Sequence, residues 1–235
     1  MPQSTLYTPI VQSTDPVTLI GGGDATPQDL HKALRLAPTC VAADGGAALA
    51  VAEQVPLAAV IGDFDSVSAD VLSAVPVAAH HRIQEQDSTD FEKALVRIAA
   101  PVVVGVGFLG GRVDHQLAAF HSLMRYPDRP CVLLGAHEVI CLAPPHIQID
   151  TVAGDDVSLF PLGGVTGRSS GLVWPIDGLE FSPGKQSGTS NRAEGPITLH
   201  MSAPAMLLIL PRRFMPALVE QFLRSDVARW PALSK

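Results

Sequence analysis

The sequence predicts an α/β fold, in which an N-terminal, mostly parallel sheet flanked by helices is followed by a C-terminal antiparallel β-sandwich domain. In the first half, short β-branched or alanine-rich runs alternate with amphipathic segments, which is typical of a parallel sheet covered by helices. After about Cys141, glycine and proline interrupt the chain every several residues and the apolar runs shorten, which is typical of antiparallel strands. We expect one domain at residues 1–143 and another at 144–235, with Pro144 and Pro145 as the hinge.

The elements of the first half follow from these apolar runs. The predicted strands are Val17–Ile20, Thr39–Ala43, Leu57–Ile61, Val102–Val106 and Cys131–Leu134, with Val75–Ala79 as a weaker candidate. The predicted helices are Gln28–Ala37, Ala47–Gln54, Thr89–Ala99 and Val113–Met124. The last two carry apolar residues at i, i+3 or i+4, and i+7, the spacing of one helix face.

The apolar runs of the second half are shorter, and glycine and proline residues separate them. The predicted strands are Ile147–Ile149, Val157–Phe160, Gly171–Trp174, Ile197–Met201 and Met206–Leu210. A closing helix is predicted at Met215–Arg224.

Composition narrows the classes of function. The chain has 235 residues, of which 47% are hydrophobic and 17% charged, and a formal net charge of −7. Such a chain is globular, and it lacks the basic patch expected of a protein that binds nucleic acid or an anionic membrane. No apolar stretch is long enough to cross a bilayer, and no signal peptide is evident. The three cysteines have no CxxC spacing, so neither a disulfide framework nor a zinc site is expected, and we predict a cytoplasmic protein.

The strongest local signal is a pair of acids, Asp63 and Asp65, directly after the apolar strand Leu57–Ile61. Side chains at i and i+2 of extended backbone point to the same side, so the two carboxylates can meet at one point. Converging oxygen ligands suit Mg²⁺, whose remaining ligands in proteins often include a phosphate. A solvated acidic turn is the alternative for the pair taken alone.

Other strands of the first half also end in glycines and acids. Thr39–Ala43 runs into Asp44, Gly45 and Gly46, and Val17–Ile20 runs into three glycines and Asp24. Ligands of open α/β sheets bind outside the carboxyl ends of the strands, so these residues mark a candidate site.

Two glycine pairs stand just before predicted helices. Gly45-Gly46 and Gly110-Gly111 would let the backbone approach a ligand, and free N–H groups at a helix N-terminus bind phosphate well. Tight strand-to-helix turns are the alternative. Neither pair is part of a GxxxxGK[ST] loop, so a P-loop kinase is disfavoured.

The starts of two helices carry further polar residues. Thr89 and Glu92 have capping-box spacing, and Asp87 and Asp90 flank the cap. Favourable placement in the helix dipole explains one such acid but not both. At the next helix, Arg112 can bind phosphate with two hydrogen bonds. Asp114 could accept from a ribose or purine group or be a simple first-turn acid, and His115 could be an ordinary surface histidine.

Taken together, these residues resemble the thiamine pyrophosphokinase family. The matching segments appear in the family's order: DGGA at 44–47, GDFDS at 62–66, QDSTDFEKAL at 86–95, GGRVDH at 110–115, SGLVW at 170–174 and TSN at 189–191. Each is moderately specific and the ordered set is highly specific. The resemblance implies that ATP and thiamine react with Mg²⁺ to give AMP and thiamine diphosphate. It also implies a homodimer with active sites near the subunit interface.

The resemblance also implies roles for individual residues. Asp63, Asp65 and Asp90 would be the catalytic residues that hold Mg²⁺ and the triphosphate. The ATP site would be formed by Asp44, Gly45, Gly46, Gly110, Gly111, Arg112, Asp114 and His115. The thiamine site would be formed by Gln86, Asp87, Trp174, Ser190 and Asn191.

Three details of this assignment stay open. An indole face suits a cationic thiazolium, but Trp174 could also be a core residue. Gln86 stands where many bacterial members carry lysine. Arg192 follows Asn191 where an acid is often found.

Two other functions remain to be considered. The DFDS segment superficially resembles the signature of haloacid dehalogenase phosphatases, but that nucleophile follows the first strand of its sheet, whereas Asp63 follows a later one. The other alternative is a non-catalytic sensor of nucleotide or thiamine diphosphate. The intact carboxylates argue against it, and measured turnover decides.

Overall fold

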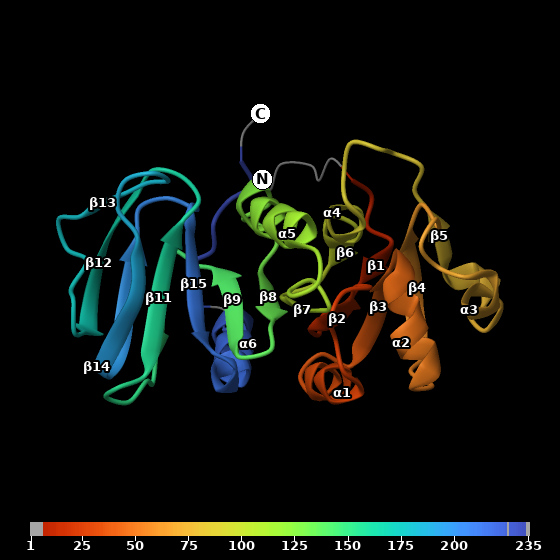
Figure 1. Cartoon of the computed structure of the whole chain (residues 1–235), viewed down its shortest axis with the longest axis horizontal. Coiled ribbons are helices and arrows are strands. Elements are labelled where there is room, and N and C mark those ends of the chain that lie inside the picture. The colour runs from red at the N-terminus through yellow and green to blue at the C-terminus, as the bar shows by residue number, and fades with distance from the viewer. Residues whose placement is uncertain (1–6, 225, 234–235) are drawn as a thin grey trace. The chain divides into compact units, whose positions relative to one another are not determined.

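The structure is a computed structural model that describes residues 7–224 and 226–233 (Figure 1). The chain divides into two compact units. Among the described residues, unit 1 comprises 7–122 and 133–136, and unit 2 comprises 123–132 and 137–233. Helix α5 (Val113–Arg125) and strand β8 (Cys131–Leu134) are each divided between the two units. The functional boundary between residues 143 and 144 stays a prediction.

Unit 1 is built on parallel strands, as the alternating pattern predicts. Strand β3 (Thr39–Ala43) pairs with β4 (Leu57–Gly62), and β4 pairs with β5 (His80–Arg82). Strand β2 (Val17–Ile20) pairs with β7 (Val103–Val106), also in parallel. Because all these strands run the same way, their carboxyl ends deliver the segments that follow them to the same edge.

The helices of unit 1 are short apart from α5. They are α1 (Pro27–Leu34), α2 (Ala47–Ala52), α3 (Ala69–Ser73) and α4 (Asp90–Leu95), with 3₁₀ turns η1 (Asp44–Gly46) and η2 (Val77–Ala79). Thr26 and Asp29 form a reciprocal capping box at α1. In Figure 1, α2 lies against β3 and β4. Between strands and helices lies a core that includes Ile20, Leu30 and Val60, all fully buried.

Two predictions for unit 1 are wrong in detail. The candidate strand Val75–Ala79 forms η2, and the next three residues form β5. The helix predicted to reach Ala99 ends at Leu95, and Ile98–Ala99 forms β6, which pairs with β1 (Val11–Gln12). Helical spacing placed Ile98 on the helix face, but a buried β-branched residue also suits a strand, and the long-range partner strand decides.

Unit 2 consists mainly of antiparallel strands. They are β9 (Glu138–Leu142), β10 (His146–Ile149), β11 (Asp156–Pro161), β12 (Val165–Leu172), β13 (Glu180–Phe181), β14 (Gly188–Met201) and β15 (Met206–Pro211). The turn η3 (Arg212–Phe214) and helix α6 (Met215–Leu223) follow, which places the closing helix where it is predicted.

Strand β14 joins two groups of strands in unit 2. Its first residues, from Gly188 to Arg192, pair with β11, whereas residues from Ala193 to Met201 pair with β12, and residues 197–200 also pair with β10. Because β14 changes partners along its length, the strands that pair with it fall into two groups, as in a sandwich.

The predicted strand Gly171–Trp174 is wrong in its bounds. Gly171 and Leu172 are the last residues of β12, which begins at Val165, and the pairing with β14 shifts register beside Gly171, whose φ is +78°. Within residues 7–224 and 226–233, no helix is long and apolar enough to cross a membrane.

Candidate active site

The carboxyl ends of β3 and β4 bring three carboxylates together in unit 1. Asp44 follows β3 directly, and Asp63 and Asp65 follow β4. One oxygen from each of these side chains lies within 4.8 Å of the other two. Phe64, between the two acids, has a φ of +68°, so the backbone turns sharply there. Three oxygen ligands at this separation could hold one hard divalent cation.

Asp44 is the buried member of this cluster. Only 1% of the residue is exposed, and its Oδ2 accepts a hydrogen bond from the backbone N–H of Ser66 at 3.1 Å. Its Oδ1 is buried and has no hydrogen-bond partner among the residues that the structure describes. Burial raises the pKa of Asp44 to about 6, against the lowering effect of the Ser66 N–H, and the charge of nearby Asp90 raises it further. A buried oxygen without a donor, beside other carboxylates, is suited to a cation.

Asp63 and Asp65 both accept hydrogen bonds from nearby donors. Asp63 Oδ2 accepts from Lys93 Nζ at 2.8 Å, and its Oδ1 accepts from the backbone N–H of Asp65 at 3.2 Å. The hydrogen bond from Lys93 lowers the pKa of Asp63 most. Asp65 is exposed and accepts from Ser66 Oγ at 2.8 Å. The two carboxylates do meet at one place, but the turn at Phe64 brings them together and not the extended backbone on which the prediction was based.

Asp90 lies next to this cluster at the start of α4. The helix begins after Thr89, whose side chain accepts from the backbone N–H of Glu92 at 3.3 Å, the contact that the capping-box spacing predicts. Asp90 Oδ1 accepts from Lys93 Nζ at 3.0 Å. Asp90 is thus tied to Asp63 through one ammonium, and a ligand role for it stays a prediction.

Lys93 is a site residue that the sequence reasoning missed. Its spacing of i+3 from Asp90 placed it on the same helix face, but nothing in the local pattern indicates that its side chain is only 2% exposed.

The first glycine pair serves the turn between β3 and α2. A Cβ built on Gly46 would lie 2.1 Å from the carbonyl oxygen of Ile20, whereas one built on Gly45 meets nothing closer than 3.4 Å. The close approach of β2 therefore accounts for glycine at 46, which favours the tight-turn alternative there. Phosphate binding by this pair stays a prediction.

The second glycine pair precedes α5 and has left-handed backbone, with φ of +79° at Gly110 and +62° at Gly111. Both N–H groups have internal acceptors. Gly110 donates to Gln116 Oε1 at 3.1 Å, and Gly111 donates to Asp24 Oδ2 at 3.0 Å. A phosphate would therefore have to replace these acceptors.

The polar residues at the start of α5 are on the surface. Arg112 pairs with Asp114 through two hydrogen bonds of 3.1 and 2.5 Å, and these hydrogen bonds lower the pKa of Asp114 to about 2. His115 is exposed. The Arg112 and Asp114 side chains are 70% and 64% exposed, so a ligand can reach both members of the pair.

Gln86 and Asp87 lie on the loop between β5 and α4 and are exposed. Within residues 7–224 and 226–233, the side-chain amide of Gln86 makes only a long hydrogen bond, 3.4 Å, to the carbonyl oxygen of Gln84. Its amide is therefore available to a ligand.

Unit 2 contains a hollow of about 410 Å³ between the end of β12 and the start of β14. Trp174, Ser190 and Asn191 all line it, so three residues predicted for the thiamine site come together. Trp174 is 58% exposed, which rules out the alternative that it is a core residue. The rest of the lining is Pro175, Ile176, Leu179, Phe181, Gln186, Ser187, Gly188 and Thr189.

Asn191 holds the backbone of Trp174 in place. It is 5% exposed, its Oδ1 accepts from the Trp174 N–H at 3.2 Å, and its Nδ2 donates to the Trp174 carbonyl at 2.7 Å. Ser190 has a φ of +62° and donates its N–H to Ser158 Oγ at 3.0 Å. Asn191 thus supports the wall of the hollow, and the Trp174 indole is free to face a ligand.

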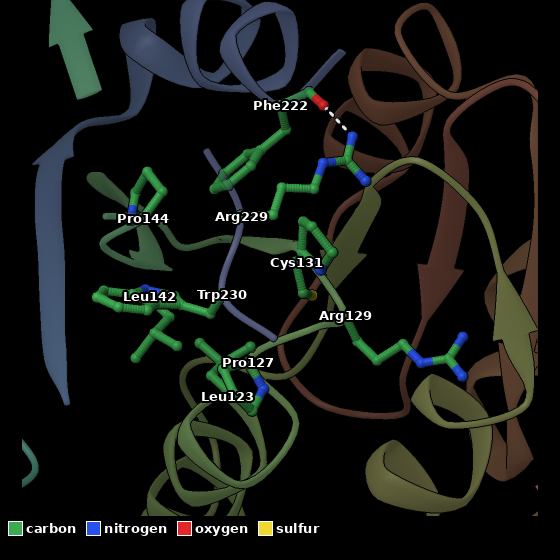
Figure 2. Close-up of a pocket in the computed structure, with 10 residues that line it drawn as sticks. Leu123, Pro127, Arg129, Cys131, Leu142, Pro144, Phe222, Arg229 and Trp230 are labelled. Carbon is green, nitrogen blue, oxygen red and sulfur yellow. Dashed lines mark hydrogen bonds between the residues drawn. The ribbon is translucent and has the colours of Figure 1, made fainter. Parts of the chain in front are cut away.

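A second cavity in unit 2, of about 20 Å³, is closed by the C-terminal segment (Figure 2). Arg229 donates to the carbonyl of Phe222 at 2.5 Å, and the Trp230 indole N–H donates to the carbonyl of Ala143 at 2.8 Å. This volume holds about one water molecule, so the cavity is not a substrate site.

Comparison with known proteins supports the sequence resemblance. Residues 30–133 match the family model described as thiamin pyrophosphokinase, catalytic domain. Thiamine pyrophosphokinase 1 of Arabidopsis thaliana is 32% identical over 164 residues, which are 61% of this chain and 61% of the relative. The chain thus matches about three fifths of the length of that curated relative.

Solved structures show the same fold. The thiamin pyrophosphokinase of Candida albicans aligns with a TM-score of 0.71 at 17% identity, over 90% of this chain and 95% of that one. The thiamin pyrophosphokinase of Geobacillus thermodenitrificans aligns with a TM-score of 0.69 at 24% identity, over 83% and 96% of the two chains. The predicted fold class is therefore confirmed. The catalytic-domain match and the partial match to the Arabidopsis protein thus make this chain similar to thiamine pyrophosphokinases over part of its length, and the solved structures show that it has their fold.

Proposed function

We propose that this protein transfers the pyrophosphoryl group of ATP to the hydroxyl of thiamine, giving thiamine diphosphate and AMP. The observation that carries the proposal is the cluster of Asp44, Asp63 and Asp65, which present oxygens within 4.8 Å of one another and include a buried Asp44 oxygen with no hydrogen-bond partner among the described residues. Such a cluster is suited to the metal ion that accompanies a nucleoside triphosphate. The match of residues 30–133 to the catalytic-domain model points the same way.

In this reaction the thiamine hydroxyl oxygen attacks the β-phosphorus of ATP, the bond from that phosphorus to the α,β-bridging oxygen breaks, and AMP leaves with that oxygen. Mg²⁺ is the proposed metal, and when bound it would offset charge on the phosphate oxygens. Asp63, Asp65 and Asp90 would hold it, and Asp44 presents a further oxygen to the same place. Asp65 and Asp90 are the candidates for orienting the hydroxyl and accepting its proton.

The remaining predicted residues would bind the two substrates. The exposed guanidinium of Arg112 can pair with phosphate once it leaves Asp114, and the loops of Gly45-Gly46 and Gly110-Gly111, with His115, would surround the nucleotide. The hollow beside Trp174 has the volume of a small-molecule site, and its exposed indole suits the cationic thiazolium. Ser190 and Asn191 would complete this thiamine pocket, and Gln86 and Asp87 would contact the aminopyrimidine.

A homodimer in the cytoplasm completes the proposal. The resemblance implies the dimer, and sedimentation equilibrium at micromolar concentration would test it. Cys40 and Cys141 are buried free thiols, which agrees with a reducing compartment.

The proposed reaction is tested by measuring AMP formation by the purified protein with ATP, Mg²⁺ and thiamine, omitting each in turn. AMP formed in step with thiamine diphosphate, and lost on adding EDTA, is the expected result. Inorganic phosphate or ADP released without thiamine would support a hydrolase, and binding of thiamine diphosphate without turnover would support a sensor.

Asp65→Asn tests the role of the acidic cluster in this reaction. We expect turnover to fall by orders of magnitude with an unchanged circular dichroism spectrum, because an exposed carboxylate is lost without disturbing the core. Asp15→Asn removes an exposed acid outside the cluster and should keep full activity. Near-normal turnover of Asp65→Asn would contradict the assignment.

A further inference from the structure

Two histidines meet on adjacent strands of unit 2, and neither of them lines the hollow beside Trp174. His146 is the first residue of β10, and His200 lies directly opposite it on β14. Residues opposite each other in an antiparallel pair have Cβ atoms about 4.5–5.5 Å apart on the same face of the sheet. The backbone therefore holds the two imidazoles side by side, although 54 residues separate them in the sequence and no local motif indicates the pair.

The face of the strands that carries the two rings is open to solvent. On β10, Ile147 and Ile149 are buried. On β14, Leu199 is fully buried, whereas its neighbour His200 is exposed. Because side chains alternate along a strand, both histidines are on the face opposite the core. A dissolved ion can therefore reach both rings.

The two rings turn the same nitrogen toward each other. His146 Nδ1 and His200 Nδ1 are 3.3 Å apart. The ring centroids are farther apart, at 4.4 Å, and the ring planes are tilted by 42°, so both Nδ1 atoms are on the inner sides of their rings. A neutral imidazole has one nitrogen without a proton, and such a nitrogen is the commonest protein ligand of transition-metal ions.

The separation of the nitrogens matches that of two histidines bound to one tetrahedral ion. Zn–N distances are about 2.0–2.1 Å, so two nitrogens at a tetrahedral angle are about 3.3–3.4 Å apart. A hydrogen bond between the rings is the alternative. The observed 3.3 Å is long for one, because N–H donors usually lie about 2.7–3.2 Å from their acceptors. The geometry therefore favours two ligands of one ion over a donor and its acceptor.

We propose that His146 and His200 form a binding site for a first-row transition-metal ion such as Zn²⁺ or Cu²⁺, with water in the remaining coordination positions. Imidazole nitrogen suits these ions, whereas Mg²⁺ prefers oxygen ligands. The site thus differs in chemistry from the cluster of Asp44, Asp63 and Asp65 in unit 1. The proposal is independent of the proposed reaction.

A bound ion would fasten one end of β10. Among the described residues, β10 forms strand pairs with β14 and with no other strand. The residues before His146 are Pro144 and Pro145, which have no N–H to donate to a neighbouring strand. An ion that binds both histidines would therefore hold the start of β10 against β14 and stabilise the folded chain.

The surroundings of the pair limit the affinity of the site. Arg168 is exposed and lies directly opposite His200 on β12, which pairs with β14 along the side away from β10. A guanidinium in this position repels a metal ion, although solvent screens part of the repulsion. With two protein ligands in place of the four of a structural zinc site, and with this cation nearby, we expect weaker binding than at structural zinc sites.

Electron paramagnetic resonance of bound Cu²⁺ tests the proposal on the whole chain. One equivalent of Cu²⁺ is added with excess Mg²⁺, which competes for oxygen ligands. Nitrogen nuclei bound to Cu²⁺ split its signal, so the spectrum reports how many nitrogens bind the ion. We expect the pattern of two imidazole nitrogens. A spectrum of oxygen ligands alone would overturn the proposal, so the test does not depend on whether any variant folds.

His146→Gln and His200→Gln each remove one ligand from the solvent face. Each should remove the two-nitrogen pattern and weaken Cu²⁺ binding at least about tenfold, because loss of even an outer-shell partner of a metal ligand costs about that much. The matched control is His137→Gln, which removes an exposed histidine of the same unit outside the pair. The control should behave as the wild type. Unchanged binding in either pair variant, or an equal loss in the control, would overturn the proposal.

Arg168→Gln tests the sign of the charge that the site accepts. We expect this variant to bind Cu²⁺ at least as tightly as the wild type, because it loses a cation beside His200. Weaker binding would contradict the proposal.

Stability in Zn²⁺ gives a second measurement. With excess Mg²⁺ present, added Zn²⁺ should raise the urea midpoint of the wild type and of His137→Gln more than those of His146→Gln and His200→Gln. Equal rises in all four proteins would overturn the proposal. These measurements use neither ATP nor thiamine, so a failure of AMP formation refutes the proposed reaction separately from the histidine site.

Discussion

Replacement of Asp44 by asparagine should stabilise the metal-free protein at neutral pH while removing its activity. The side chain is 1% exposed, and burial raises its pKa from the ordinary 3.8 to about 6. At about 1.4 kcal/mol per pKa unit, the difference corresponds to about 3 kcal/mol. The asparagine side chain would keep an oxygen to accept from the Ser66 N–H and would turn an amide toward the neighbouring carboxylates.

The sign of the pH dependence follows from the direction of the shift. Because the pKa of Asp44 is higher in the folded protein, its contribution to stability is present below pH 3.8 and is lost as the pH rises to about 6. Asp44→Asn does not titrate. The variant should therefore match the wild type near pH 4 and exceed it in the free energy of unfolding by up to about 3 kcal/mol at pH 7–8.

The assay is urea unfolding at a series of pH values in EDTA, followed by circular dichroism, with Asp15→Asn as the exposed control. Adding Mg²⁺ should then stabilise the wild type more than Asp44→Asn, since the ion binds the folded state through the carboxylate that the variant lacks. A constant difference between variant and wild type at every pH, or a less stable variant at pH 8, would refute the reasoning. The backbone conformation does not confound the test, because asparagine tolerates the positive φ of +41° found at this position.

Three further predictions concern other parts of the chain. Gly46→Ala should lower the free energy of unfolding by about 2–4 kcal/mol, because its Cβ would lie 2.1 Å from the Ile20 carbonyl oxygen. Gly45→Ala, the control, should change the free energy of unfolding by less than about 1 kcal/mol. Urea unfolding measures both variants, and equal effects would show that the backbone relaxes around the new Cβ. Trp174→Ala should raise the KM for thiamine at least tenfold with little change in stability, because the indole is 58% exposed, and steady-state kinetics would reveal an unchanged KM if the hollow does not bind thiamine. Cys141, whose pKa is raised to about 12 by burial, should not react with a thiol reagent such as 5,5′-dithiobis(2-nitrobenzoic acid) until the protein unfolds, and rapid native-state labelling would contradict its burial.

The spacing of apolar residues and the composition of each run predicted most of the fold, because most helices and strands of unit 1 have a clear apolar pattern in the sequence. The runs at Val17–Ile20 and Thr39–Ala43 form strands with those bounds, and a helix does start at Ala47. The failures come from long-range pairing. Ile98 fits a helix face in the sequence but pairs with Val11 in the structure, and a strand partner so distant in sequence leaves no local signal.

The sequence predicted the parts of the candidate site that depend on residues close together in the chain. It did not predict which of the site's side chains are buried. The nearness of Asp63 and Asp65 in sequence, directly after a strand, was enough to predict that the two carboxylates lie together, although a turn at Phe64 and not extended backbone brings them there. The burial of Asp44 and Lys93 depends on how β3, β4 and α4 pack, which the sequence does not state. In the sequence, Asp24 is simply the residue that follows three glycines. Its hydrogen bond from the Gly111 N–H could not be predicted, because the two residues are far apart in sequence and only the fold brings them together.

The two tryptophans of the chain differ in a way that gives the protein an intrinsic optical reporter. The Trp174 indole is exposed at the mouth of the larger hollow, while its backbone is held on both sides by Asn191. The Trp230 indole is hydrogen-bonded to a backbone carbonyl and lines the small closed cavity. We expect a small molecule that binds in the larger hollow to quench or shift the emission of Trp174, without an attached dye.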